Sequence, residues 1–186
     1  MREVHVLPQP VGAYIDVLFS TRGEVLDRME SGTVLVLDAG FYSFDWALIV
    51  GGELRRSASG SSLEAMSVLI EHVARDLCVR YGGRPQPLGL EATLRAGRAK
   101  FRHNGSQVAL APLMQRAAQD VARVALEALR QGLRRESTNI ELVVIAGGGG
   151  TLYGELATEL FPQATIAVAA EPVSANALGF FHYGAR

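Results

Sequence analysis

The residues best suited to chemistry lie between two apolar runs: Asp38, Gly40, Ser43 and Asp45. A carboxylate that directly follows an apolar strand lies at the end of that strand, where an ion or a ligand can reach it. Gly40 lacks the side chain that would keep a bulky anion away from a backbone amide. The spacing therefore indicates a site for a cation and an anion, although Asp-x-Gly between strands is also the usual composition of a hairpin turn.

A second candidate site follows the apolar run 142–146, where Gly147, Gly148, Gly149 and Gly150 come in succession. Because glycine loses more backbone entropy on folding than other residues, such a loop is typical of contact with a flat ligand or an anion. The sequence lacks the Gly-Lys-Ser/Thr of a phosphate-binding P-loop. It fits the dinucleotide-binding fingerprint only loosely, through Glu171 at the end of the next strand.

The elements that would position these residues are strands. The runs on either side of Gly40 are strand-length, which predicts a buried strand, a tight turn and a second strand. Strands are also predicted at Ile140–Ala146 and Thr165–Ala169, with helices before, between and after them. Such alternation is typical of parallel strands with helices on both faces, and it predicts an α/β fold.

Near the beginning of the chain, a short strand is predicted at Glu3–Leu7 and a helix from Pro10, since proline suits the first turn of a helix. Gln9 then lies where the strand gives way to the helix. The polar segment 21–32 is predicted to be a surface loop. After a returning strand at Glu53–Ser57, a second helix is expected.

That second helix is predicted to begin near Gly60 and Ser61, with Glu64 completing a capping box. Its apolar stripe comprises Leu63, Met66, Ile70, Val73 and Leu77. A third long helix is predicted from Pro112 to a C-cap at Gly132.

Between these two helices, residues 82–111 differ in composition from the rest of the chain: they contain paired glycines, two prolines and a basic cluster. Asn104-Gly105 predicts a two-residue hairpin turn. The cluster could bind an acidic partner or nucleic acid, or could simply be a solvated hairpin face. His103 has no histidine or cysteine at ligand spacing, so we expect no protein-built metal site. The basic residues, apart from His103, are Arg95, Arg98, Lys100 and Arg102.

Length and composition predict one globular body, because 186 residues that are 48% hydrophobic can bury a full core. The net charge of −1 gives no overall field that favours nucleic acid or membrane. Cys78 is the only cysteine, which excludes an internal disulfide and suits a reducing compartment. No leader-like or membrane-spanning run is present, and a cytoplasmic location is expected.

Taken together, the two loops resemble motifs of the actin-like ATPases. Asp38–Asp45 is similar to their second phosphate loop, Asp-x-Gly-x-x-Thr-x-Asp/Glu, with Ser43 in place of the threonine, and Gly147–Gly149 is similar to their adenosine loop. Val6–Ala13 resembles the strand-to-helix corner of bacterial actins. Glu171–Phe181 resembles the closing segment of ParM- or StbA-type plasmid-segregation actins and their archaeal relatives.

The resemblance covers residues 4–184, yet nothing in the sequence resembles the first phosphate loop that opens an actin-like protein. It therefore implies that residues 1–186 are the C-terminal lobe of an actin-like ATPase. The implied fold is ribonuclease H-like, a mixed sheet with helices on both faces, and a small inserted subdomain is expected at 82–111.

The resemblance also implies roles for individual residues. Asp38 would hold Mg²⁺ through water, Gly40 and nearby amides would meet the phosphates of ATP or ADP, and Ser43 would lie on the γ-phosphate side. Asp45 would contact the ligand or support the loop. Gln9 would orient the attacking water, unless it is only a solvated loop residue.

At the other end of the nucleotide, Gly147, Gly148 and Gly149 would lie against adenine and ribose. Gly60 and Glu64 are candidate contacts, with a purely capping role for Glu64 as the alternative.

The implied function is the nucleotide-binding lobe of a filament-forming ATPase of plasmid-segregation or cytoskeletal type. The expected partners are further copies of the protein, an N-terminal lobe and a DNA-binding adaptor, without direct nucleic-acid or membrane contact. ATP hydrolysis is expected only with the N-terminal lobe, so this chain alone should be inactive. The alternatives are a lobe of a sugar or metabolite kinase of the same superfamily, and a scaffold domain without catalysis.

Overall fold

The computed structural model describes residues 6–134, 136 and 139–185, with Thr151 and Leu152 described in their backbone only. Its main body is built on a five-stranded sheet with the strand order β3-β2-β1-β6-β7. Among the described residues, no helix is both long and apolar enough to cross a membrane.

The sheet is mixed. The central strand β1 pairs antiparallel with β2 and parallel with β6, and β6 pairs parallel with β7. Chain direction reverses in the tight turn between β1 and β2, so the predicted strand, turn and strand are confirmed. The strands are β1 (Thr33–Ala39), β2 (Phe44–Val50), β3 (Glu53–Ser62), β6 (Leu142–Ala146) and β7 (Thr165–Val168).

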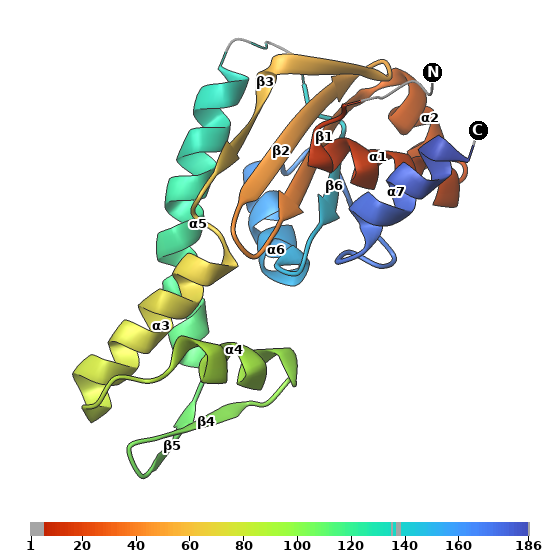
Figure 1. Cartoon of the computed structure of the whole chain (residues 1–186). Helices are drawn as coiled ribbons and strands as arrows, with labels where there is room; N and C mark the ends of the chain where they lie inside the picture. The colour runs from red at the N-terminus through yellow and green to blue at the C-terminus, as the bar shows by residue number, and fades with distance from the viewer. Residues whose placement is uncertain (1–5, 135, 137–138, 186) are drawn as a thin grey trace.

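Helices cover both faces of the sheet, as predicted (Figure 1). Because side chains alternate along a strand, Val34 and Val36 of β1 pack toward one group of helices, and Leu35 and Leu37 pack toward the other. The first group comprises α1 (Gln9–Ser20), α2 (Glu24–Ser31) and α7 (Ala175–Gly184). The second comprises α5 (Ala111–Leu133) and α6 (Gly150–Leu160).

A smaller part of the molecule lies below the sheet in Figure 1 and has an apolar cluster of its own. This cluster joins α3, α4, the β4–β5 hairpin and the first half of α5 around Leu90, which is fully buried. The predicted hairpin turn is confirmed, since Asn104 and Gly105 both have positive φ. The elements are α3 (Met66–Tyr81), α4 (Pro87–Arg95), β4 (Lys100–His103) and β5 (Ser106–Ala109).

The α4 helix and the hairpin lie within 82–111, the range predicted for an inserted subdomain. Their apolar cluster also draws on α3 and α5, outside that range. Whether 82–111 is a unit of its own stays a prediction. The exposed Arg98, Lys100 and Arg102 are on the hairpin and the segment before it, while His103 is buried, with Nε2 2.7 Å from the carbonyl oxygen of Gly82.

Three local predictions were wrong. Segment 21–32 contains helix α2, because Met29 supplies a buried anchor in an otherwise polar stretch. Ser61 belongs to strand β3, and α3 begins only at Met66 without a side-chain cap, so Ser61 and Glu64 form no capping box. Gly132 is the second-last residue of α5, and the C-cap is Arg134 instead.

Two further predictions concern the flanks of these elements. Leu63, predicted on the buried stripe of the second helix, precedes that helix and is 78% exposed. Most of the strand predicted at 3–7 lies outside the described residues, and Val6 and Leu7 are not in a strand.

Candidate functional site

The β1–β2 turn places four of the predicted site residues close together. Asp38 and Asp45 are paired across the two strands, and the Ser43 hydroxyl donates to Asp45 Oδ2 at 2.5 Å. The Gly40 amide donates to the Ser43 carbonyl at 2.9 Å. A Cβ atom on Gly40 would lie 2.8 Å from that same oxygen, so the turn can be this tight only with glycine.

The glycine loop meets this turn because β6 runs parallel to β1, so that both strands end at the same edge of the sheet. The Gly149 amide donates to the Ala39 carbonyl at 2.9 Å, which fixes the loop against the end of β1. Gly147 has a φ of 84°, and a Cβ atom there would lie 2.7 Å from Asp38 Oδ1. The two predicted motifs are therefore in direct contact.

Asn176, at the start of α7, connects the site to two further elements. Its Nδ2 donates to Asp38 Oδ2 at 2.7 Å, and its Oδ1 accepts from the Ala13 amide of α1 at 3.1 Å. Asp38 is only 2% exposed, and this burial raises the pKa of its carboxyl. The Asn176 hydrogen bond acts to lower that pKa, and the charge of Asp45 acts to raise it.

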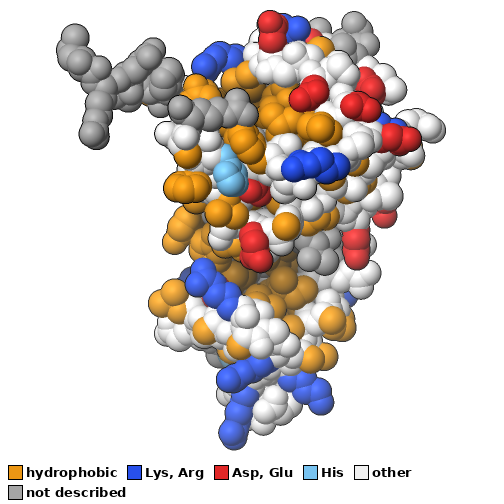
Figure 2. Space-filling view, turned by 90° about the vertical axis from the view of Figure 1, so that its right-hand side faces the viewer, with side chains coloured by type: hydrophobic (Ala, Val, Ile, Leu, Met, Phe, Trp, Pro, Cys, Tyr) orange, Lys and Arg blue, Asp and Glu red, His pale blue; other side chains and the backbone are white. Residues whose placement is uncertain are grey.

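Asp38 and Asn176 line a cavity of about 820 Å³ between the edge of the sheet and the smaller part of the molecule. Its volume lies within the range of small-molecule sites, roughly 300–1,000 Å³. Figure 2 shows hydrophobic side chains where the two parts meet, with Lys and Arg side chains gathered at the tip of the smaller part. The lining comprises Gln9, Asp38, Gly40, Phe41, Met66, Ile70, Glu91, Leu94, Arg95, Gly147, Gly148, Val173 and Asn176.

Gln9, Asp38, Gly40, Gly147 and Gly148 are thus the predicted residues that share this cavity. Gln9 is the first residue of α1.

Ser43, Asp45 and Gly60 line a neighbouring pocket of about 520 Å³, which Gln9 also borders. A Cβ atom on Gly60 would lie 2.5 Å from the Trp46 ring, so this glycine also has a packing role.

Gly149 and Glu64 do not line the large cavity. Gly149 is buried, and a Cβ atom there would lie 3.1 Å from Ala39 Cβ and 3.2 Å from Met66 Sδ. The backbone carbonyl of Glu64 accepts a hydrogen bond from the Tyr153 hydroxyl at 3.2 Å. Burial, with a contribution from the Glu64 charge, raises the pKa of Tyr153 to about 12.

Among the polar residues that line the cavity, the sequence-based site prediction omitted Asn176, Glu91 and Arg95, and Asn176 is the one that is hydrogen-bonded to Asp38. Its role depends on contacts with α1 and β1, which are distant in the sequence. The one signal in the sequence was that Asn176 lies within Glu171–Phe181, the segment that resembles the closing segment of plasmid-segregation actins.

The glycine loop leaves room for a flat ligand. Gly148 is exposed, and a Cβ atom there would meet nothing within 4 Å, so the loop presents backbone to open space. Among the described residues, no group of three His, Cys, Asp or Glu side chains could hold a metal ion. A Mg²⁺ ion would not need such a group, since it is commonly bound by one or two carboxylates, waters and ligand phosphates.

In the comparison with family models, residues 36–158 match the model described as archaeal actin homologue MreB-like, C-terminal. This match covers well over half of the chain. The comparison with curated protein sequences found no match.

Comparison with solved structures finds the same fold in actin homologues. The archaeal actin homologue Ta0583 is 22% identical, with a TM-score of 0.81. The aligned region covers 97% of this chain and 55% of the Ta0583 chain. Ta0583 in complex with ADP gives 22% identity, a TM-score of 0.79, and coverage of 97% and 57%. A ParM filament from Clostridium botulinum gives 20% identity, a TM-score of 0.73, and coverage of 96% and 52%.

At these identities the likeness establishes an actin-like fold. The chain spans about half the length of these structures.

Proposed function

The chain belongs to the family of archaeal MreB-like actin homologues, of which it carries the C-terminal part, and we propose that it is the nucleotide-binding lobe of a filament-forming, actin-like ATPase. Its ligands would be ATP and ADP with Mg²⁺. The lobe would contribute the second phosphate loop, Asp38–Asp45, and the adenosine loop, Gly147–Gly149.

One observation carries this proposal: the β1–β2 turn and the glycine loop touch each other and open onto one cavity of about 820 Å³. A single nucleotide could contact both. The ADP complex of Ta0583 supports the choice of ligand, since that protein has the same fold.

At the phosphate end, the buried Asp38 carboxylate would hold the metal ion through water, and Asn176 would keep that carboxylate in place. Bound Mg²⁺ would supply positive charge that offsets the charge on the phosphates. Gly40 would let the backbone approach the phosphates. Ser43 would lie on the γ-phosphate side, and Asp45, which accepts its hydrogen bond, would support the turn.

At the nucleoside end, Gly148 would lie against adenine or ribose, with Gly147 and Gly149 fixing the loop behind it. Gln9 would orient the attacking water from the start of α1. Gly60 and Glu64 would act at the margin of the site.

Turnover would require an N-terminal lobe to close the other side of the nucleotide. Nucleotide state would then control self-association into filaments, as in a plasmid-partitioning or cytoskeletal protein of the cytoplasm, with a DNA-binding adaptor linking filament to cargo. The filament structure of a ParM protein with the same fold supports this part of the proposal.

Calorimetry with Mg·ATP tests the proposal. We expect weak or undetectable binding and no hydrolysis with this chain alone, and clear binding and hydrolysis once it is extended upstream by an N-terminal lobe. Pelleting of the extended protein should depend on ATP. Tight ATP binding by the chain alone would contradict the division of the site between two lobes, and an extended protein that binds no ATP would contradict the function.

A further inference from the structure

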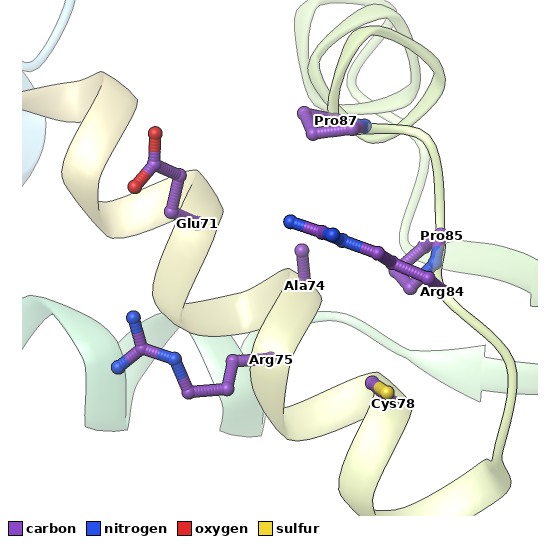
Figure 3. Close-up of a pocket in the computed structure, with 7 residues that line it drawn as sticks. All are labelled: Glu71, Ala74, Arg75, Cys78, Arg84, Pro85 and Pro87. Atoms are coloured by element: carbon purple, nitrogen blue, oxygen red, sulfur yellow. The ribbon is translucent and has the colours of Figure 1, made fainter.

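A third pocket, of about 490 Å³, lies between α3 and the segment that leads into α4 (Figure 3). Glu71, Ala74, Arg75 and Cys78 line it from α3. Arg84, Pro85 and Pro87 line it from the opposite side.

This pocket is separate from the cavity proposed to bind nucleotide, and the two share no lining residue. On α3, Ile70 lines the large cavity, while the next residue, Glu71, lines this pocket. The fully buried Leu90 of α4 belongs to the apolar cluster that joins α3 to α4 and so holds the two sides of the pocket together. Because the two cavities share no lining residue, the nucleotide proposal does not account for this pocket.

Charge in the pocket favours an anion. Arg75, Arg84 and one acidic residue, Glu71, border the pocket, and Arg84 is the arginine whose guanidinium faces it, since Figure 3 shows the Arg75 side chain extending away from Arg84. Figure 3 shows the Arg84 side chain extending from its segment toward α3, across the opening. In the described part of the chain Arg84 makes no ion pair, whereas Arg80 of α3 pairs with Asp76 at 3.7 Å.

The rest of the wall is apolar or weakly polar. Ala74, Pro85 and Pro87 present hydrocarbon surface to the pocket, and Cys78 presents an exposed thiol. A small inorganic ion would leave this surface without a contact. An organic anion would pack an apolar body on it and place its carboxylate at Arg84, since guanidinium and carboxylate form paired hydrogen bonds.

We propose that the pocket between α3 and residues 84–87 binds an organic carboxylate with an apolar body, and that Arg84 is the residue that recognises the carboxylate. Glu71 weakens this site by repelling the ligand. Binding here requires neither the nucleotide nor the N-terminal lobe, so this proposal and the proposed function stand or fall separately.

Cys78, the only cysteine of the chain, reports on the pocket. Its thiolate attacks the neutral disulfide 4,4′-dithiodipyridine, forming a mixed disulfide and releasing one pyridinethione, which is followed by absorbance. We expect 2-naphthoate to slow this reaction saturably at constant ionic strength, and acetate at the same concentration to leave it unchanged. A rate that 2-naphthoate does not change would overturn the proposal.

Variants identify the group responsible. Arg84→Gln should raise the concentration of 2-naphthoate needed for protection about tenfold, as expected for loss of a charged hydrogen bond. Arg80→Gln, which removes the same charge from the same region, should leave that concentration unchanged, and Glu71→Gln should lower it. Urea unfolding of each variant checks its fold. Equal protection in Arg84→Gln and the parent protein would refute the role of Arg84.

Discussion

At the scale of single residues, the candidate site depends on a backbone that comes close to a buried carboxylate. Gly147 adopts positive φ beside Asp38, and Gly148 next to it faces open space. The same loop therefore contains one glycine that the fold requires and one that it does not. A substitution at Gly147 therefore tests the stability of the fold, whereas one at Gly148 tests ligand binding.

We predict that Gly147→Ala destabilises the protein by at least about 2 kcal/mol, because alanine at positive φ is strained and its Cβ would meet Asp38 and Ala39. Gly148→Ala, one residue further along, should change the free energy of unfolding by less than about 0.5 kcal/mol. Urea unfolding of both variants makes the comparison. Equal stability of the two would show that the contact between the loops is absent.

Asn176 provides a second prediction at this scale. Asn176→Ala removes the donor to Asp38 Oδ2 and the acceptor for the Ala13 amide, and leaves both groups in a buried place. We expect a loss of about 1–3 kcal/mol in urea unfolding. A variant as stable as the parent protein would mean that the Asp38 carboxylate is positioned by something else.

That Asp38, Gly40 and Gly147 lie close together could be predicted from the sequence, because each marks the end of an apolar strand and parallel strands end at one edge of a sheet. The sequence did not identify Asn176 as a site residue, since the contact with Asp38 joins positions 138 residues apart. Nor could it assign Ser43 and Asp45 to a neighbouring pocket, because that depends on the direction of side chains after the turn.

At the scale of elements, α1 and α7 pack closely enough for backbone contact. A Cβ atom on Gly12 would lie 2.5 Å from the Asn176 carbonyl, and one on Gly179 would clash with the Gly12 carbonyl. Asp16 of α1 is buried at this crossing, with His182 of α7 3.9 Å away. The contact supports the site because Asn176 is part of α7.

Asp16 gives a pH-dependent prediction. Burial raises the pKa of its carboxyl above the ordinary value of 3.8, against a smaller lowering by His182. The folded chain therefore prefers the protonated carboxyl, and this preference costs stability as pH rises through the folded-state pKa. Asp16→Asn should be more stable than the parent protein near neutral pH, with the gain shrinking as pH falls to about 4.

Urea unfolding of both proteins across that pH range measures the gain. If the gain instead grows toward low pH, the pKa of Asp16 is lowered rather than raised, and the assignment of burial as the main cause is wrong.

The sheet and α5 meet at Trp46, whose indole Nε1 donates to the Ala58 carbonyl at 2.9 Å. The ring packs between Gly60 of β3 and Gly132 of α5. Gly60→Ala should cost about 1–3 kcal/mol and change the tryptophan fluorescence, because the ring must shift. Gly89→Ala, with open space around it in α4, is the control and should be neutral or slightly stabilising. Unchanged fluorescence in Gly60→Ala would contradict this packing.

Among the elements, the sequence predicted those with long apolar patterns and failed where a tertiary contact decides. Helix α2 depends on the single buried Met29, which its polar neighbours conceal. Strand β3 continues to Ser62 because Gly60 and Ser61 pair with Trp46 and Asp45 of β2. Serine and glycine carry no strand signal of their own, so a helix start was predicted there instead.

At the scale of the whole molecule, the cavity lies between the edge of the sheet, which has an apolar core on each face, and the smaller part with an apolar core of its own. A ligand there would contact the smaller core through Ile70, and on the other side the end of the sheet through Asp38 and Gly147. The chain spans about half the length of the actin homologues it resembles. A complete ATPase site is therefore proposed only for this lobe together with an N-terminal one.

The most direct test is the affinity of Mg·ATP for the protein extended by an N-terminal lobe, measured by calorimetry with Gly148→Leu. A leucine there would project into open space at the cavity and should weaken binding at least about tenfold without loss of stability. Gly154 lies on α6 and also faces open space, so Gly154→Leu is the control and should bind Mg·ATP as the parent protein does. Unchanged affinity in Gly148→Leu would contradict the claim that the acidic turn and the glycine loop hold one nucleotide.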